Sequence, residues 1–461
     1  MTELLGAPAR ATARAGGRVP PGPPRRATPR LLRQLVSDRL AMMRDGADTY
    51  GDAVRYRMGP QTMYLFNHPD TAKHVLADNA ANYTKGIGLV HARRAIGDGL
   101  LTSDGELWRT QRDLVRPAFA HRRIVEQAGA VADEATALVD RLRVASDHGP
   151  VDVGAHLTDL TLGVLGRTLL DGALTRAGGV DIASAFESVQ DQAMFELVTL
   201  SAVPHWLPLP GQLRFRRARR RLEGIVAGLV AERSGRPPGP DVLSRLIDSA
   251  AAEPDPAVGR RRTRDELVTL LLAGHETTAS TLSWTLHLVD GRPDVARRLH
   301  EEAVAVLGDR PPRYDDLRSL TYTLQVVQEA MRLHPPVWML PRRSVDEDEV
   351  GGYRVPARTD VVVCPYTMHR HREFWPDPDL FDPERFAPAA VRDRPRYAYI
   401  PFGGGPRFCV GSQLGTMEAV FVVAVLAREL RLRSLPGRAA VPEPMLSLRV
   451  RGGLRMTVHP A

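Results

Sequence analysis

Hydrophobic residues recur at helical spacing along most of the chain and alternate at the spacing of a strand in only a few short stretches. A helical pattern begins at Leu31, and residues 125–235 predict several amphipathic helices. The proline-rich stretch at residues 204–210 interrupts them, because proline cannot continue a helix. Residues 414–430 are apolar and predict another helix. The pattern therefore predicts a mainly α-helical fold with a smaller β-rich part.

The β-rich part is expected where apolar and polar residues alternate on either side of glycine-containing turns. The expected strands are a hairpin at residues 54–58 and 62–66 around Gly59-Pro60, a strand pair around Gly351-Gly352 with residues 361–364, and a closing hairpin at residues 446–450 and 454–458 around Gly452-Gly453. Residues 86–101 contain several glycines and predict a loop.

The longest expected helix covers residues 263–292. Thr263-Arg264-Asp265-Glu266 has the form of a capping box, in which the first and last side chains bond backbone N–H groups of the first turn. Apolar residues at helical spacing follow it and form one buried stripe.

Candidate chemistry lies inside that helix, where Ala273 and Gly274 precede Glu276 and Thr277. A small-residue pair lets a helix lie close to a flat cofactor. Glycine beside side chains that bond backbone carbonyls also favours a local opening of the helix. Glu276 places an acid next to the alcohol of Thr277, as a proton relay requires. A helix whose polar residues face solvent is the ordinary alternative.

Residues 402–411 form a loop rich in glycine that contains a single cysteine, Cys409. A thiolate in such a loop can be an axial metal ligand, tuned by backbone N–H groups aimed at its sulfur. Arg407 stands two residues before it and could meet a carboxylate of the same ligand. A glycine-rich turn with a buried, inert cysteine is the alternative.

Two residue pairs each share one face of a predicted helix. Trp108 and Arg112 are four residues apart, and Glu329 and Arg332 are three apart. The ordinary alternatives are a partly buried surface tryptophan for the first pair and an exposed ion pair of little energetic value for the second.

Composition narrows the class of protein. The 461 residues include two cysteines, Cys364 and Cys409, so neither a disulfide framework nor a CxxC zinc site is expected, and a reducing cytoplasm fits best. No apolar stretch approaches the roughly 20 residues that span a bilayer. Residues 1–30 are rich in proline and arginine and are expected to be a disordered tail, with residues 31–461 forming a single domain.

The formal net charge of +8 could favour nucleic acid, an acidic protein or an anionic surface. Arginines cluster at positions 214, 216, 217 and 219–221. No base-reading module surrounds them, so a solvated helix face is the better interpretation, and no nucleic-acid partner is expected.

Taken together, the cysteine loop, the helix motif, the two residue pairs and the sequence Pro383-Glu384-Arg385-Phe386 resemble the cytochrome P-450 family in their order. The resemblance runs from about residue 30 to the end of the chain. It implies that a haem b lies between the long helix and the loop, with the Cys409 thiolate as the proximal iron ligand.

The resemblance also implies roles for the other residues. Trp108 and Arg112 would bond haem propionates, as would Arg342, for which Arg343 is the alternative in register. Glu276 and Thr277 would be catalytic and supply protons. The expected cofactor-binding residues are Trp108, Arg112, Ala273, Gly274, Arg342, Phe402, Arg407, Cys409 and Gly411, with Cys409 as the metal ligand, and Glu329, Arg332 and Arg385 are expected to form a buried network.

The activity implied is monooxygenation, in which one oxygen atom from O2 enters a hydrophobic small molecule. Residues 336–356 resemble bacterial members that oxidise terpenes in secondary metabolism. Hydroxylation or epoxidation of a polyketide or a fatty acid is the alternative substrate class. A peroxide-driven enzyme or an isomerase of the same fold is the alternative chemistry. The substrate pocket is expected to be lined by Ile87, Leu89, Val90, Leu270, Val337 and Leu340.

The sequence contains no flavin or nicotinamide fingerprint and no cysteine cluster for an iron–sulfur centre. Electrons are therefore expected from a separate ferredoxin and ferredoxin reductase. Arg116, Arg122 and Arg123 are candidates to attract an acidic ferredoxin. A cytoplasmic protein without a membrane anchor is expected.

Overall fold

The structure, a computed structural model, describes residues 17–461 except residues 60, 171, 173, 175, 200, 201, 205 and 238. Pro60 of the first expected turn, residue 205 of the proline-rich stretch and residues 1–16 of the expected tail therefore lie outside the described residues.

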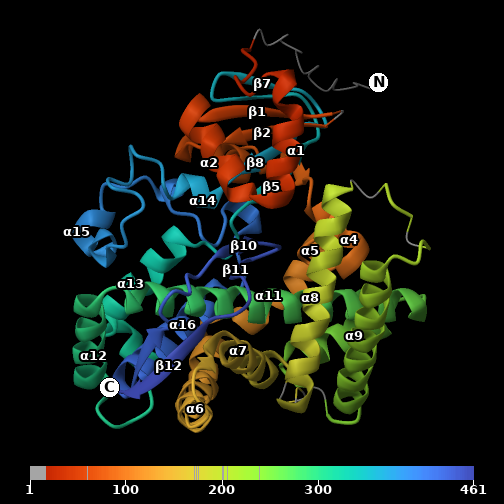
Figure 1. Cartoon of the computed structure of the whole chain (residues 1–461). Coiled ribbons are helices and arrows are strands. Elements are labelled where there is room, and N and C mark those ends of the chain that lie inside the picture. Colours follow the sequence, from red (N-terminus) through yellow and green to blue (C-terminus); the bar gives the residue numbers. More distant parts are fainter. Residues whose placement is uncertain are drawn as a thin grey trace, which may run out of the picture.

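Helices make up most of the described chain, as predicted (Figure 1). They are α1 (Thr28–Ser37), α2 (Arg39–Tyr50), α3 (Pro69–Lys73), α4 (Leu89–Ile96), α5 (Gly105–Val115), α6 (His121–Ser146), α7 (Val153–Leu169), α8 (Arg176–Val198), α9 (Pro210–Ser234), α10 (Val242–Ala251), α11 (Pro256–Asp290), α12 (Pro293–Leu307), α13 (Thr321–Leu333), α14 (Pro365–Met368), α15 (Pro388–Val391) and α16 (Ser412–Glu429). The expected break at residues 204–210 separates α8 from α9.

The strands form several small sheets, the largest with the order β1-β2-β8-β5-β3. They are β1 (Ala53–Met58), β2 (Gln61–Phe66), β3 (Tyr83–Lys85), β4 (Val151–Asp152), β5 (Leu340–Ser344), β6 (Asp348–Val350), β7 (Tyr353–Val355), β8 (Asp360–Val363), β9 (Leu430–Ser434), β10 (Pro442–Pro444), β11 (Leu448–Val450) and β12 (Arg455–Pro460). The predicted hairpins β1–β2 and β6–β7 are both present as antiparallel pairs.

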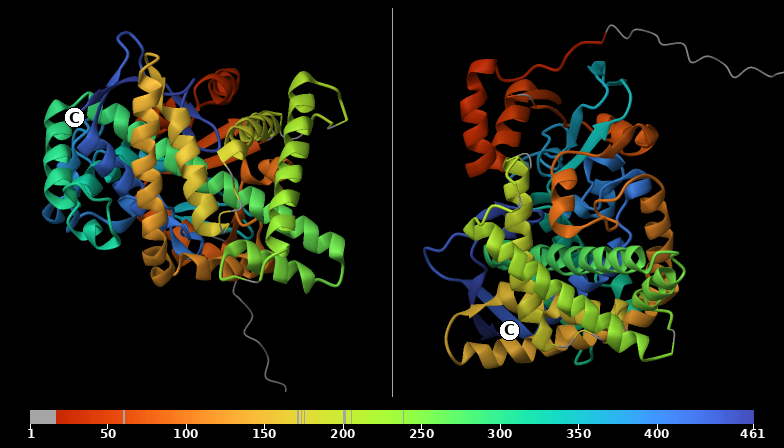
Figure 2. Two further views of the ribbon diagram at one scale, coloured as in Figure 1. Left: turned by 90° about the horizontal axis from the view of Figure 1, so that it is seen from below. Right: turned by 90° about the vertical axis from the view of Figure 1, so that its right-hand side faces the viewer.

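The large sheet lies at one end of the molecule and most of the helices lie at the other, where β12 also lies (Figures 1 and 2). The large sheet lies with α1 and α2 at one end. At the other end, α11 runs through the middle of the helices and packs against α7, α13 and α16.

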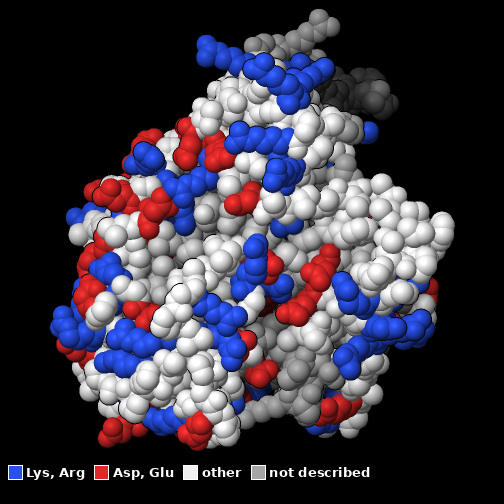
Figure 3. Space-filling view, in the orientation of Figure 1, with Lys and Arg blue, Asp and Glu red and all other residues white. Residues whose placement is uncertain are grey.

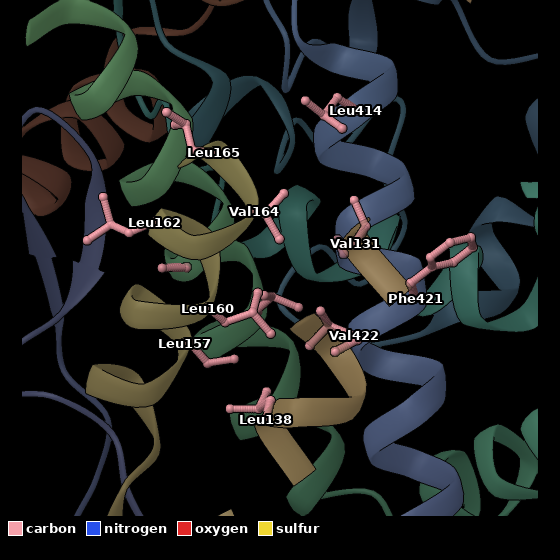
Figure 4. Close-up of a cluster of buried hydrophobic side chains, with 14 of the residues drawn as sticks. Val131, Leu138, Leu157, Leu160, Leu162, Val164, Leu165, Leu414, Phe421 and Val422 are labelled. Atoms are coloured by element: carbon pink, nitrogen blue, oxygen red, sulfur yellow. The ribbon is translucent and has the colours of Figure 1, made fainter. Parts of the chain in front are cut away.

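The main core lies where α6, α7 and α16 meet. Figure 4 shows side chains such as Leu138, Leu160 and Val422 from these three helices, and all three are fully buried. Residues 419–426 of α16 are apolar on every face, which is typical of a helix enclosed on all sides. This packing holds the start of α16, and with it the preceding cysteine loop, in a fixed place.

The long helix begins earlier than predicted. Its N-cap is Asp255, whose side chain accepts a hydrogen bond from the Ala257 N–H, and Pro256 occupies the first helical position. The supposed capping box at residues 263–266 is therefore wrong. Asp265 and Glu266 lie inside the helix, where both side chains are buried.

The expected closing hairpin is also wrong. β11 pairs with β10, whereas β12 pairs with β9 and β4. β11 is instead fixed to α11, because Ser280 and Trp284 both donate side-chain hydrogen bonds to the Leu448 carbonyl. Each of these strands pairs with the strand that lies beside it in the folded chain. A local turn pattern carries no information about that neighbour.

Two expected irregular segments contain ordered structure. Residues 86–101 include α4, whose Ala92, Ala95 and Ile96 are buried. In the expected tail, the Pro21 carbonyl accepts a hydrogen bond from Arg55 N–H on the edge strand β1, and α1 begins at Thr28. Proline-rich backbone supplies carbonyl acceptors to a sheet edge, so residues 17–30 are not a free tail.

Among the described residues, we find no helix with both the length and the apolar composition that crossing a membrane requires.

Candidate functional site

One cavity of about 380 Å³ collects the candidate site residues. It lies between α11, α7 and the loop that precedes α16. Residues from β5, α5, α8, α13, the segments before and after α4 and the segment before β11 also contribute to its walls. Every expected cofactor-binding and catalytic residue lines it: Trp108, Arg112, Ala273, Gly274, Glu276, Thr277, Arg342, Phe402, Arg407, Cys409 and Gly411.

The cysteine loop presents Cys409 to this cavity. The Cys409 N–H donates to the Phe402 carbonyl at 3.0 Å, which closes the loop. Gly405 has φ +64° and packs against the Leu76 carbonyl, so no other residue fits there. The Cys409 side chain has surface exposed to the cavity, and protein atoms surround the sulfur. That burial raises the pKa of the Cys409 thiol, while the Gly411 N–H and Arg112 lower it.

The wall formed by α11 carries the acid and the alcohol. The Thr277 hydroxyl donates to the Ala273 carbonyl at 2.8 Å. Glu276 accepts two hydrogen bonds at Oε1, each of 2.8 Å, from Gln190 on α8 and from Ser447 before β11. Three separate segments therefore meet at this carboxylate.

Gly274 has a packing role that the sequence analysis did not predict. A Cβ there would lie 2.0 Å from Leu165 Cδ1 on α7. The missing side chain thus lets α11 approach α7 and still leaves Ala273 and Thr277 facing the cavity.

Cations gather at one end of the cavity. Arg342 and Lys85 are buried, and Arg112 and Arg407 line the same region. Arg407 forms an ion pair with Asp104. Burial and the neighbouring guanidinium groups hold the pKa of Lys85 well below its ordinary value. Burial also lowers the pKa of Arg342 to about 10.

Four cations share one carboxylate at this end of the cavity. Among the described residues, neither Lys85 nor Arg342 has a carboxylate within ion-pair distance. The surplus positive charge fits a ligand that carries carboxylates of its own.

The structure distinguishes the two candidate arginines of β5. Neighbouring residues of a strand point to opposite faces. Arg342 lines the cavity, and Arg343 instead forms an ion pair of 2.6 Å with Asp360. Trp108 lies in the same cationic region, with the Arg407 guanidinium 4.6 Å from its ring centre.

The expected network around Glu329 is buried. Arg332 donates to both carboxylate oxygens of Glu329, at 2.6 and 2.8 Å, and neither side chain is exposed. Arg332 also donates to three backbone carbonyls between α14 and the helical turn at Pro383–Phe386. Arg385 Nε lies 3.6 Å from Glu329 Oε1.

The expected substrate-lining residues divide into two groups. Leu89, Leu270, Val337 and Leu340 line the cavity. Ile87 instead faces a smaller pocket beside α1, and Val90 is 37% exposed on the surface of α4.

Two charged cavity residues were missed. Lys85 is one of only two lysines among 62 basic residues, and that rarity was its one sequence signal. Glu418 on α16 is buried, one of its carboxylate oxygens has no hydrogen-bond partner within the described part of the chain, and burial raises its pKa well above the ordinary value. Its place in an otherwise apolar helix was the signal for it.

The chain is similar in sequence to known proteins over most of its length. The Cytochrome P450 family profile matches residues 20–454. The chain is 35% identical over 413 residues to cyclooctatin synthase of Streptomyces melanosporofaciens, which covers 89% of both proteins. It is 35% identical over 390 residues to cyclooctat-9-en-7-ol 5-monooxygenase of the same organism, covering 84% of each. It is 31% identical over 388 residues to pentalenene oxygenase of Streptomyces avermitilis, covering 84% of this chain and 85% of the relative.

Proposed function

Because the chain belongs to the cytochrome P450 family of oxidoreductases, we propose that it is a haem-thiolate monooxygenase that inserts one oxygen atom from O2 into a terpene. The observation that carries this proposal is the single cavity, which brings together Cys409, the cationic end and the Glu276–Thr277 pair.

Haem b is the proposed cofactor, and the residues present fit it. Cys409 would hold the iron, and Lys85, Arg112, Arg342 and Arg407 would meet the two propionates. The unpaired charge of Lys85 and Arg342 is the feature that calls for such anions. When bound, the haem would supply the binding and reductive cleavage of O2.

The protein's own part is to move protons and exclude water. The Thr277 hydroxyl faces the cavity and can exchange its bond to the Ala273 carbonyl for one to a water. Glu276 Oε1 is held by Gln190 and Ser447. Among the described residues its Oε2 makes no hydrogen bond, so this oxygen is free to take a proton from outside and pass it on.

A terpene substrate is supported by the lining and by the relatives. The wall beyond the cationic end is apolar, with Leu89, Leu270 and Val337 among its residues. The relatives named above include an oxygenase of pentalenene and a monooxygenase of cyclooctat-9-en-7-ol. A polyketide or a fatty acid remains the alternative class. The retained acid–alcohol pair favours O2 chemistry over a peroxide-driven reaction or an isomerisation.

The proposed electron donor is a separate ferredoxin with its reductase, in the cytoplasm. Arg116 and Arg122 are well exposed and lie next to α5, which contributes Trp108 and Arg112 to the cavity.

Figure 3 shows acidic and basic side chains interspersed over the face in view, with a group of basic residues over α9, and no continuous basic surface of the kind nucleic acid requires.

The experiment that tests the function has two stages. First, the purified chain is reduced under carbon monoxide, and the absorption band characteristic of thiolate-bound haem is expected. Second, a panel of terpene hydrocarbons and alcohols is incubated with ferredoxin, its reductase and 18O-labelled O2. One labelled oxygen atom per product molecule is expected, and products without label would contradict monooxygenation.

A further inference from the structure

The loop at residues 97–103 joins α4 to the start of α5 and forms part of the cavity wall. Leu100 and Leu101 line the cavity. At the end of the loop, the Ser103 carbonyl accepts a hydrogen bond of 3.3 Å from Arg407. The position of this loop therefore affects both the apolar wall and the cationic end.

Two adjacent carboxylates of α11 hold this loop by its backbone. The Asp98 N–H donates to Asp265 Oδ2 at 2.9 Å, and the Leu100 N–H donates to Glu266 Oε2 at 2.9 Å. Both acidic side chains are buried, with Glu266 only 1% exposed. A carboxylate that accepts a backbone N–H in a buried place makes a strong, directional contact.

Glycines make the close docking of the loop possible. A Cβ at Gly97, which has φ +84°, would lie 2.3 Å from the Asp265 carboxylate carbon. A Cβ at Gly99 would lie 2.5 Å from the Asp265 carbonyl oxygen and 2.1 Å from Thr269 Oγ1. The loop thus rests directly on the surface of α11, with no space for a side chain between them.

Among the residues that the structure describes, Glu266 has no cationic partner within ion-pair distance and no hydrogen bond at Oε1. Asp265 is the charged group that acts on it. The neighbouring arginines form other ion pairs: Arg264, also on α11, with Asp265 and Glu223, and on α4 Arg93 with Asp98 and Arg94 with Glu196. Burial and Asp265 raise the pKa of Glu266 to about 7, although the Leu100 N–H lowers it.

We infer that Asp265 and Glu266 are positioning residues, which dock residues 97–103 on α11 and thereby set the shape of the cavity wall formed by Leu100 and Leu101. Neither side chain touches the proposed cofactor site. They act on substrate fit through the loop, and Glu266 makes the docking depend on pH.

The direction of that dependence follows from proton linkage. When the loop is lifted and water reaches Glu266, its pKa returns toward the ordinary value of 4.5, compared with about 7 in the docked state. Docking is therefore most favourable below about pH 4.5. It weakens as the pH rises from there to about 7, and it is constant above. The two pKa values limit the change in the docking equilibrium to the order of 100-fold between pH 5 and pH 8.

Hydrogen exchange of the Leu100 amide in the full-length protein measures docking directly. After correction for the intrinsic pH dependence of exchange, we expect protection in the wild type to fall by about tenfold or more from pH 5 to pH 8. Glu266→Gln keeps an acceptor oxygen but does not titrate, so its protection is expected to stay within about twofold. Glu134→Gln, at another buried glutamate on α6, should behave as the wild type.

Two results would overturn the inference. One is wild-type protection that does not change with pH. The other is a change in Glu266→Gln as large as in the wild type, which would assign the titration to another group. Exchange needs no haem, so this test can fail independently of the proposed function.

A second variant tests the effect on the cavity and rests on the proposed haem site. Gly99→Ala cannot keep the docked loop, because its Cβ would overlap the Asp265 carbonyl. The affinity of the haem-loaded variant for clotrimazole, a large apolar azole, should change by more than tenfold. Its affinity for imidazole, which is too small to reach the wall, should stay within about twofold. Equal changes for both azoles, or none for either, would show that the loop does not shape the cavity.

Discussion

Cys364 and Cys409 are the same side chain in different surroundings. Cys364 directly follows β8 in the chain and is fully buried, and its Sγ lies 3.1 Å from the Trp338 carbonyl. Cys409 faces the cavity. The site, and not the residue type, therefore decides which sulfur can reach a bound iron.

We expect Cys409→Ala to lose the thiolate-type spectrum and all turnover above background, because no other cysteine lines the cavity among the described residues. Cys364→Ala is the matched control and should retain both. The spectrum of the reduced, carbon monoxide-bound variants is the measurement. Loss of the band in Cys364→Ala alone would contradict the assignment.

Thr277 and Thr278 offer a second matched pair on α11. Removing the Thr277 hydroxyl should leave substrate binding and the consumption of reductant intact, since neither uses it. Product formed per electron pair should fall by up to about a hundredfold, with hydrogen peroxide released instead. Thr278 lies about 100° further round the helix, so Thr278→Ala should lose much less.

Product and peroxide yields per reductant consumed check this prediction. If Thr278→Ala releases peroxide and Thr277→Ala does not, the alcohol has been placed one residue out. If both variants remain coupled, protons reach the site by another route.

At the scale of elements, the Glu329–Arg332 pair on α13 holds the segment before α15 by hydrogen bonds to its backbone. Arg332 donates to the Pro378 and Leu380 carbonyls of that segment. The Asp382 N–H also donates to Glu329 Oε1, at 2.9 Å. Removing one member of such a buried pair leaves the other charge without compensation.

Arg332→Ala should therefore lower the free energy of unfolding by about 3–5 kcal/mol and release haem during purification. Arg297→Ala breaks an exposed helical pair with Glu301 and is the matched control, with an expected loss near 0.5 kcal/mol. Thermal unfolding and haem content are the measurements. A stable, haem-loaded Arg332→Ala protein would refute the bracing role.

At the scale of the whole molecule, the net charge of +8 is spread over many exposed arginines. Several of those near α5 are paired with acidic neighbours, as Arg122 is with Glu126 at 3.5 Å. Attraction of an acidic partner therefore depends on a local excess of positive charge. Salt screens the field of such exposed charges over a distance of about 10 Å at 0.1 M ionic strength.

Reduction by a plant-type [2Fe–2S] ferredoxin should slow as ionic strength rises from low to physiological values. Arg122→Glu should slow it several-fold at low salt and weaken the salt dependence. Arg214→Glu, on α9, should change neither. A stopped-flow reduction rate that does not change with ionic strength would count against electrostatic steering by this surface.

A local sequence pattern is sufficient to predict features that depend on a short stretch of the chain. The helical content, the first hairpin and the helix after the cysteine loop follow from spacing over short windows, and all are present. The motif residues were found because each motif is itself a short pattern. Lys85 and Glu418 were missed because their sequence signals, a rare lysine and an acid in an apolar stretch, do not show where in the fold the side chain lies.

The sequence by itself thus determined the family, the helical class and the motif residues that line the cavity, because these depend on side-chain order along one segment. The tertiary structure alone decided the strand partners of β11 and β12, the choice between Arg342 and Arg343, and the burial of Asp265 and Glu266. Each of these depends on which distant segment comes to lie alongside. Residues 263–266 illustrate the difference. Their sequence fits a helix cap locally, but in the structure the carboxylates of Asp265 and Glu266 accept backbone hydrogen bonds from a loop about 165 residues earlier in the chain.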